Sequence, residues 1–137
     1  MADKFVLGYW GIAGLGQALR YILAYAEADW EDKKYVDREQ WFGADKSGLG
    51  IPLPNLPYLI DGDYKLTETT AIIRYLPRRL EKPELLGKTI QDQGRVDQLL
   101  GVLSDIQQTL IKDLVTEGWE ANRAEIYKKV HDKLSQL

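Results

Sequence analysis

The chain of 137 residues contains no cysteine and a single histidine, His131. The absence of cysteine excludes disulfides, Cys-zinc sites, CxxC redox chemistry and a thiol nucleophile in this sequence. A single histidine likewise excludes a metal site built from several histidines and a catalytic pairing of histidine with cysteine. Polar chemistry in this chain therefore depends on other groups, hydroxyl donors among them.

Long apolar runs and an excess of positive charge are also absent. No run approaches the ~18 apolar residues that a membrane-spanning helix needs, and the N-terminal MADKFVLGYW lacks an apolar segment of signal-peptide length. The formal net charge of −3 argues against a general nucleic-acid binder and a basic membrane-surface protein. We expect a cytoplasmic protein of one domain and part of a second.

Residues 4–36 show a strand, a glycine-rich turn, a helix and a second strand. The run FVLGYW predicts a strand at Lys4–Trp10. Apolar residues at helical spacing then predict an amphipathic helix at Gly14–Ala28, and a weaker strand pattern covers Asp29–Val36. This order implies parallel strands joined by a right-handed crossover.

A hairpin and a further helix are predicted downstream. The strand-like runs Pro57–Ile60 and Tyr64–Thr67 flank an Asp-Gly pair, which is typical of a hairpin turn. Thr67 or Thr69 can cap the helix that follows, and Pro77 should kink or end that helix. With the first strands, this predicts a sheet of about four strands covered by helices.

Residues 37–56 (DREQWFGADKSGLGIPLPNL) have no clean hydrophobic period. We expect a long surface excursion here, and segments of this kind in compact domains are usually functional or disordered. The tryptophan in the segment favours a functional loop over plain disorder.

The sequence changes character after a predicted linker at 83–88. Residues 1–82 carry the strands and the shorter helices, whereas residues 89–137 carry long helical patterns that predict a partial all-helical domain of two helices. Two apolar stripes define these helices: Val96, Leu99, Leu100, Leu103, Ile106, Leu110, Ile111 and Leu114, and then Trp119, Ile126, Tyr127, Val130, Leu134 and Leu137.

Several stretches resemble the cytosolic glutathione transferases, mu class and helminth relatives in particular: LGYWGIAGL, DREQW, PNLPYLIDGDYKLTETTAIIRYL and RVDQLL. The resemblance runs from about Phe5 to about Leu110, and PNLPYLIDGDYKLT is its most specific segment. It implies an α/β thioredoxin-like N-terminal domain of βαβ-ββα order, followed by an all-helical domain that looks truncated here. The excursion at 37–56 stands where the family has its second helix.

The resemblance assigns the catalytic role to Tyr9. Glutathione attacks as a thiolate, whereas a free thiol titrates near ~8.5, so the site must favour the anion. A phenol that donates a hydrogen bond to sulfur does this, and the N-terminus of the following helix adds positive potential. Trp10 and Leu15 are implied as glutathione contacts beside it. On its own, a tyrosine in a GYW sequence is more often a buried core aromatic.

Two short motifs are implied to bind the glutathione backbone and its γ-glutamyl end. Asn55-Leu56-Pro57 opens the third strand, where the family has a cis-proline and the backbone of Leu56 pairs with the cysteinyl unit. The same bond equally serves a purely structural role. Glu68-Thr69 begins a helix and suits the γ-glutamyl carboxylate and ammonium, although the pair also fits an ordinary helix cap.

Charged and aromatic residues are implied at the other end of glutathione. Trp41, Lys46 and Arg38 lie where the family binds the glycyl carboxylate, but the spacing from Trp41 to Asn55 is one residue longer than in the family. Lys46 is therefore also compatible with an ordinary surface lysine. Asp105 stands where mu members send a carboxylate across a dimer, and an exposed helix aspartate is the alternative.

Three functions follow from these residues. The first is an enzyme that conjugates glutathione, as co-substrate and without a metal, to hydrophobic electrophiles, as a homodimer or larger assembly. The second is a non-catalytic glutathione-transferase-like scaffold or interaction module. The third is a trimmed fragment of a longer transferase. The family's charged pair after YW is replaced by Gly11 and Ala13, and a tyrosine of its second domain corresponds to Val115.

Overall fold

The computed structural model describes residues 4–114 and 116–136. Val115 and Leu137, both singled out from the sequence, lie outside this part of the chain. The chain divides into two compact units, Met1–Leu86 and Gly87–Leu137. The predicted linker at 83–88 contains a short 3-10 helix, η3, at Pro83–Leu86.

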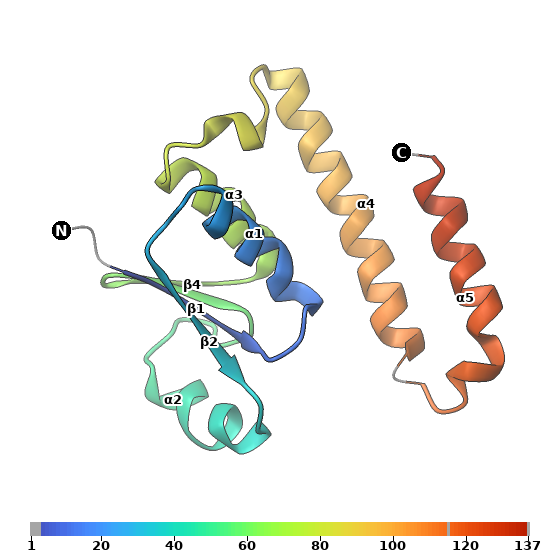
Figure 1. The fold of residues 1–137 in the computed structure, drawn as a ribbon, viewed down its shortest axis with the longest axis horizontal. Coiled ribbons are helices and arrows are strands. Elements are labelled where there is room, and N and C mark those ends of the chain that lie inside the picture. Colours follow the sequence, from blue (N-terminus) through green and yellow to red (C-terminus); the bar gives the residue numbers. More distant parts are fainter. Residues whose placement is uncertain (1–3, 115, 137) are drawn as a thin grey trace. The chain divides into compact units, whose positions relative to one another are not determined.

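The first unit is built on a four-stranded sheet, shown in Figure 1. Its strands are β1 (Phe5–Trp10), β2 (Trp30–Tyr35), β3 (Tyr58–Asp61) and β4 (Tyr64–Thr67), in the spatial order β2-β1-β3-β4. The pair β1 and β2 is parallel, and the other two pairs are antiparallel. The predicted βαβ-ββα order is confirmed. The Asp-Gly hairpin is also confirmed, with the turn starting at Gly62, which has φ 58°.

Two helices cover one face of this sheet. A 3-10 turn, η1 (Gly14–Gly16), leads into α1 (Gln17–Tyr25), and α1 contacts α3 (Thr69–Arg79). Alternate residues of the strands and one stripe of each helix meet in an apolar core. Its buried members are Phe5, Leu7, Leu19, Leu23, Leu59, Ile72 and Leu76.

The expected surface excursion at 37–56 is wrong for its first half, which is helical. A π-helix, η2 (Gln40–Asp45), continues directly into α2 (Lys46–Gly48). The backbone N–H of Lys46 donates to the carbonyl of Trp41, five residues back. Such a wide turn holds one residue more than an α-helical turn, so the 3.6-residue repeat disappears from the sequence.

Helix α3 starts at Thr69, as predicted, but its cap and its end differ from the predictions. Glu68, with φ 70°, occupies the N-cap position without a side-chain cap bond. Thr67 is not the cap, because it is buried in β4 and donates its hydroxyl to the carbonyl of Leu53 at 3.0 Å. Pro77 does not end the helix, which continues to Arg79 although the proline has no N–H to donate.

The second unit consists of two helices, α4 (Ile90–Leu114) and α5 (Trp119–Leu134). Reciprocal bonds between Thr89 and Asp92 cap the start of α4. The hydrophobic residues that are buried in the described part of this unit are Ile106 and Ile126. No helix among the described residues is long and apolar enough to span a membrane.

Candidate functional site

Four chain segments meet at one end of the strands of the sheet. Because β1 and β2 are parallel, the turn after Trp10 and the helical segment after Tyr35 leave at the same end. β3 begins at that end, since Tyr58 lies opposite Gly8, and β4 finishes there, since Thr67 lies opposite Tyr58. All the predicted site residues of the first unit lie in or beside these four segments.

Tyr9 is buried, with 4% of its surface exposed. Its hydroxyl oxygen accepts a hydrogen bond from the backbone N–H of Leu15 at 3.0 Å. Because a phenol has one hydrogen to donate and can accept at the same time, this bond leaves its own O–H available to another acceptor. Tyr9 is therefore a packed core aromatic whose hydroxyl hydrogen is available to an acceptor.

The glycines after Tyr9 make room for its ring. A Cβ on Gly14 would lie 2.6 Å from the hydroxyl of Tyr9, and one on Gly16 would lie 2.5 Å from its Cδ1. Gly14 also has a positive φ, 36°. The glycine-rich turn thus allows the start of α1 to approach the phenol closely.

Phe42 contacts two cations and the ring of Trp10. The rings of Trp10 and Phe42 are 6.2 Å apart between centroids. The guanidinium of Arg38 lies 4.9 Å from the centroid of Phe42, and the ammonium of Lys46 lies 5.3 Å from it. Phe42 was missed in the sequence, although its spacing of four residues from each cation on a helix is a usable signal.

Trp41 lies in the core rather than on a surface loop. It is 2% exposed, and its indole stacks on Tyr58 at a centroid distance of 5.9 Å. It also packs edge-on against Tyr35 at 5.5 Å. Together with Tyr9, Ile51 and Leu56 these rings form the second core cluster of the first unit. The contribution of Trp41 to a ligand site is thus limited to the small accessible part of the indole.

A partly buried polar network, which the sequence did not reveal, fixes this helical segment to the sheet. The hydroxyl of Tyr35 donates to Asp45 at 2.6 Å and lies 3.0 Å from the hydroxyl of Tyr58. The ammonium of Lys33 meets the same carboxylate at 2.6 Å. The hydrogen bond from Lys33 lowers the pKa of Asp45, whereas burial raises the pKa of Tyr35 and of Tyr58.

The segments before β3 and after β4 are joined by side chains. The peptide bond between Leu56 and Pro57 is cis, as the resemblance implied, and both residues are buried. The amide of Asn55 donates to the carboxylate of Glu68 at 3.1 Å. Thr69 is the first residue of α3.

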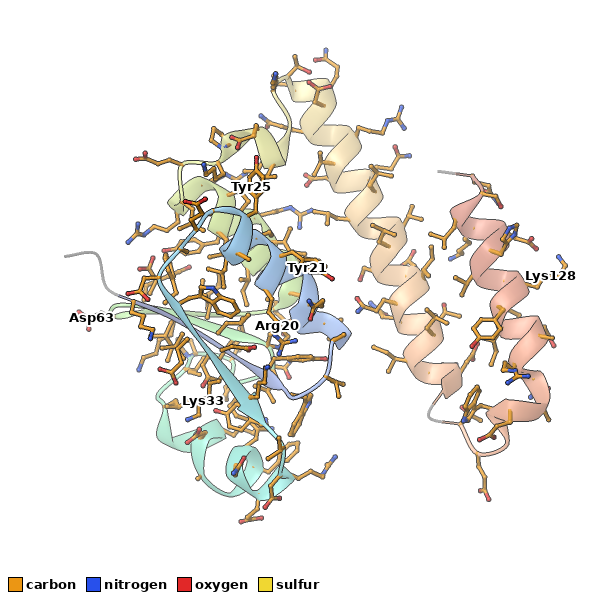
Figure 2. All side chains as sticks on the ribbon, viewed as in Figure 1. Arg20, Tyr21, Tyr25, Lys33, Asp63 and Lys128 are labelled. Atoms are coloured by element: carbon orange, nitrogen blue, oxygen red, sulfur yellow. The ribbon has the colours of Figure 1, made fainter. Side chains whose placement is uncertain are left out.

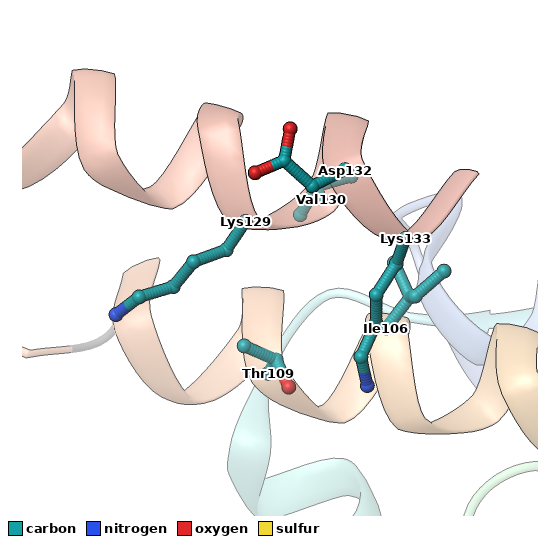
Figure 3. Close-up of a pocket in the computed structure, with 6 residues that line it drawn as sticks. All are labelled: Ile106, Thr109, Lys129, Val130, Asp132 and Lys133. Atoms are coloured by element: carbon teal, nitrogen blue, oxygen red, sulfur yellow. The ribbon is translucent and has the colours of Figure 1, made fainter. Parts of the chain in front are cut away.

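Asp105 lies on α4 in the second unit and is exposed. A separate cavity of about 330 Å³ lies between α4 and α5, lined largely by apolar surface (Figure 3). Its lining includes Ile106, Val130 and Lys133 and none of the predicted glutathione-site residues. In the described part of the chain, no three His, Asp or Glu side chains are placed to hold a metal ion.

The sheet order, its helices and the proline at the start of β3 define a thioredoxin-like domain followed by a helical unit. The model of the family described as glutathione S-transferase, N-terminal domain, matches residues 5–78. The chain belongs to the glutathione S-transferase family.

Relatives by sequence and by structure agree with this assignment. Glutathione S-transferase B of Cavia porcellus is 40% identical over 135 residues, and the alignment covers 93% of this chain and 60% of the relative. Glutathione S-transferase Mu 3 of Mus musculus is 38% identical with the same coverage. The crystal structure of the glutathione S-transferase Blo t 8 matches with a TM-score of 0.85 and 28% identity, over 96% of this chain and 61% of that one. The chain thus spans about three fifths of the length of these relatives.

Proposed function

We propose that this chain binds glutathione as co-substrate, without a metal, and conjugates its thiolate to hydrophobic electrophiles. The observation that carries the proposal is the hydroxyl of Tyr9, which accepts the N–H of Leu15 and keeps its own hydrogen to donate. A hydrogen bond to the charged form of the thiol lowers the pKa of that thiol. The partial positive charge at the start of α1 acts in the same direction.

The remaining groups of glutathione match the segments around Tyr9. The exposed cations Arg38 and Lys46, held over Phe42, suit the glycyl carboxylate. Glu68 and Thr69 stand at the N-terminus of α3, where a γ-glutamyl group meets free backbone N–H donors and a carboxylate for its ammonium. Leu56, with Asn55 and Pro57 beside it, lies in the sequence between the two cations and the start of α3. Its backbone is the group that suits the cysteinyl unit of glutathione.

The proposal is tested by titrating the 137-residue chain with glutathione and following thiolate absorbance in the ultraviolet. In the wild type we expect saturable binding and an apparent thiol pKa below the free value of ~8.5. Tyr9→Phe should lose most of the thiolate signal at neutral pH while still binding. Tyr21→Phe is the matched control, because Tyr21 is an exposed phenol of α1 and should behave as the wild type.

Three outcomes separate the candidate functions. No binding at millimolar glutathione contradicts the proposal. A thiolate that forms but never reacts with an aromatic electrophile supports the scaffold function instead. Turnover that disappears in Tyr9→Phe and persists in Tyr21→Phe supports the enzyme.

We further propose that the chain forms a homodimer or larger assembly in which Asp105 reaches the γ-glutamyl group bound by a second copy. Apolar side chains of the second unit, Leu103, Ile111 and Leu134 among them, are exposed in the single chain. Two-fold dimers are the commonest way in which soluble proteins cover such surface. Light scattering should give at least twice the monomer mass, and a monodisperse monomer would contradict the proposal.

A further inference from the structure

The turn that follows Tyr9 has no polar side chain of its own. Residues Gly11–Gly14 read Gly-Ile-Ala-Gly, and all four are exposed. Glycines leave the backbone many conformations, so such a turn is held only if other parts of the chain bind it. Yet the hydrogen bond between Leu15 and Tyr9 requires the residues on the two sides of this turn to keep a fixed position relative to each other.

Arg20 of α1 binds this turn directly. Its Nη1 donates to the carbonyl of Ile12 at 2.7 Å, and its Nη2 donates to the carbonyl of Trp10 at 3.2 Å. Its Nε donates to both carboxylate oxygens of Asp32 on β2, at 3.2 and 3.1 Å. One guanidinium therefore joins α1, β2 and the turn. Figure 2 labels Arg20, the residue of α1 that carries it.

The guanidinium is also close to the phenol itself. Its carbon lies 6.0 Å from the centroid of the Tyr9 ring. The side chains of Arg20 and Asp32 are 11% and 21% exposed, so the ion pair is largely shielded from water. Only arginine offers several donors in one rigid plane, and the ammonium of a lysine cannot reach both carbonyls and the carboxylate with the same geometry.

We propose that Arg20 is a positioning residue for Tyr9. By holding the carbonyls of Trp10 and Ile12, it fixes the turn so that the N–H of Leu15 meets the phenol oxygen and the O–H points out of the core. The effect of Arg20 on glutathione chemistry rests on the function proposed above, whereas its effect on the turn does not.

The first test uses the ligand-free chain. Hydrogen exchange at the Leu15 amide, measured by NMR, reports the bond to Tyr9. In Arg20→Met we expect this amide to exchange about tenfold faster or more, the effect of losing one hydrogen bond, while the core amides of Leu59 and Leu76 keep their protection. In Arg78→Met, which changes an exposed arginine of α3, all three amides should keep their wild-type rates.

Arg20→Lys keeps the test decisive if Arg20→Met fails to fold. Lysine retains the positive charge and the aliphatic chain but lacks the planar guanidinium with its several donors. The Leu15 amide should therefore again exchange faster than in the wild type. Unchanged exchange at Leu15 in a folded Arg20 variant overturns the proposal. Faster exchange spread equally over Leu15, Leu59 and Leu76 also overturns it, because a general loss of stability would then explain the effect.

The second test measures the thiol of bound glutathione in the same variants. We expect the apparent thiol pKa to rise in Arg20→Met and Arg20→Lys, with kcat falling more than KM changes. A wild type that does not bind glutathione disproves the proposed function and leaves the exchange result to decide the role of Arg20. A wild type that responds to Tyr9→Phe but not to either Arg20 variant disproves only the role of Arg20 in the chemistry.

Discussion

At Tyr9 the phenol has little room to move, because the backbone of the following turn packs against its ring. Gly16 is buried and has an ordinary φ, so its lack of a side chain serves packing alone. The Tyr9 ring would have to move to accept a methyl group at this position, since that group would lie 2.8 Å from Cγ. Movement of the ring would also break the bond to Leu15.

Gly16→Ala should therefore damage both stability and the site. We expect a loss of about 1–3 kcal/mol in the free energy of unfolding, as is usual when a packed core receives an extra carbon. Denaturant unfolding measures this loss, and the glutathione titration should show a weaker thiolate signal. Gly101→Ala is the control, because a Cβ there meets nothing within 4 Å and should raise helix stability by up to about 1 kcal/mol. Equal effects of the two substitutions would disprove the packing argument.

The residues of the site were more predictable than their surroundings. Tyr9, the cis bond at Pro57 and the start of α3 at Thr69 came from contiguous motifs in PNLPYLIDGDYKLTETT and LGYWGIAGL. Arg20 was missed because it acts through contacts with distant segments, which one sequence does not display. Phe42 was missed because its segment was expected to be a surface loop rather than a helix. The roles of the predicted residues in binding glutathione stay predictions.

At the scale of elements, the strands and α1 followed from hydrophobic pattern, whereas the segment at 38–48 did not. Its π-helical turn changes the face on which each residue lies. Trp41 therefore packs into the core, Asp45 meets Lys33 and Tyr35, and Lys46 lies on the exposed side. A pattern search based on 3.6 residues per turn cannot find such an element, because the repeat is broken where the turn widens.

The carboxylate of Asp45 should make the attachment of this segment depend on pH. Its pKa is lowered from the ordinary 3.8, first by the hydrogen bond from Lys33 and then by that from Tyr35. A lowered pKa in the folded state means that the stabilisation is complete above the unfolded value and is lost as the pH falls through the folded one. The contribution of Asp45 should thus be constant at neutral pH and fade below about pH 4.

Asp45→Asn measures this contribution. We expect the melting temperature of the variant to lie below that of the wild type from pH 5 to pH 8, with a gap that shrinks below about pH 4. Asp63→Asn is the control, since Asp63 is an exposed turn residue and the variant should melt close to the wild type. If the difference in melting temperature between wild type and Asp45→Asn stays the same throughout the acid range, the pKa of Asp45 is not lowered in the folded state.

For the molecule as a whole, the two units differ in how much apolar surface they bury. The first unit has two core clusters, with Leu7, Leu19 and Tyr58 among the fully enclosed side chains. In the described part of the second unit, the buried hydrophobic residues are Ile106 and Ile126. Since each fully buried large apolar side chain contributes about 1.5–3 kcal/mol, the second unit of a single chain has far less to hold its helices together.

Hydrogen exchange should show this difference directly. In a dilute solution of the protein, we expect amides of α5 to exchange at least about a hundredfold faster than those of β1 and β3. The free energy of local opening is smaller where fewer apolar contacts are lost. Mass spectrometry of peptic fragments measures both regions in one sample, and β4 serves as an edge-strand control within the first unit. Equal protection at low concentration would contradict the prediction. Protection of α4 and α5 that grows with chain concentration, while β1 and β3 stay constant, would show that a second copy covers these helices, as the proposed assembly requires.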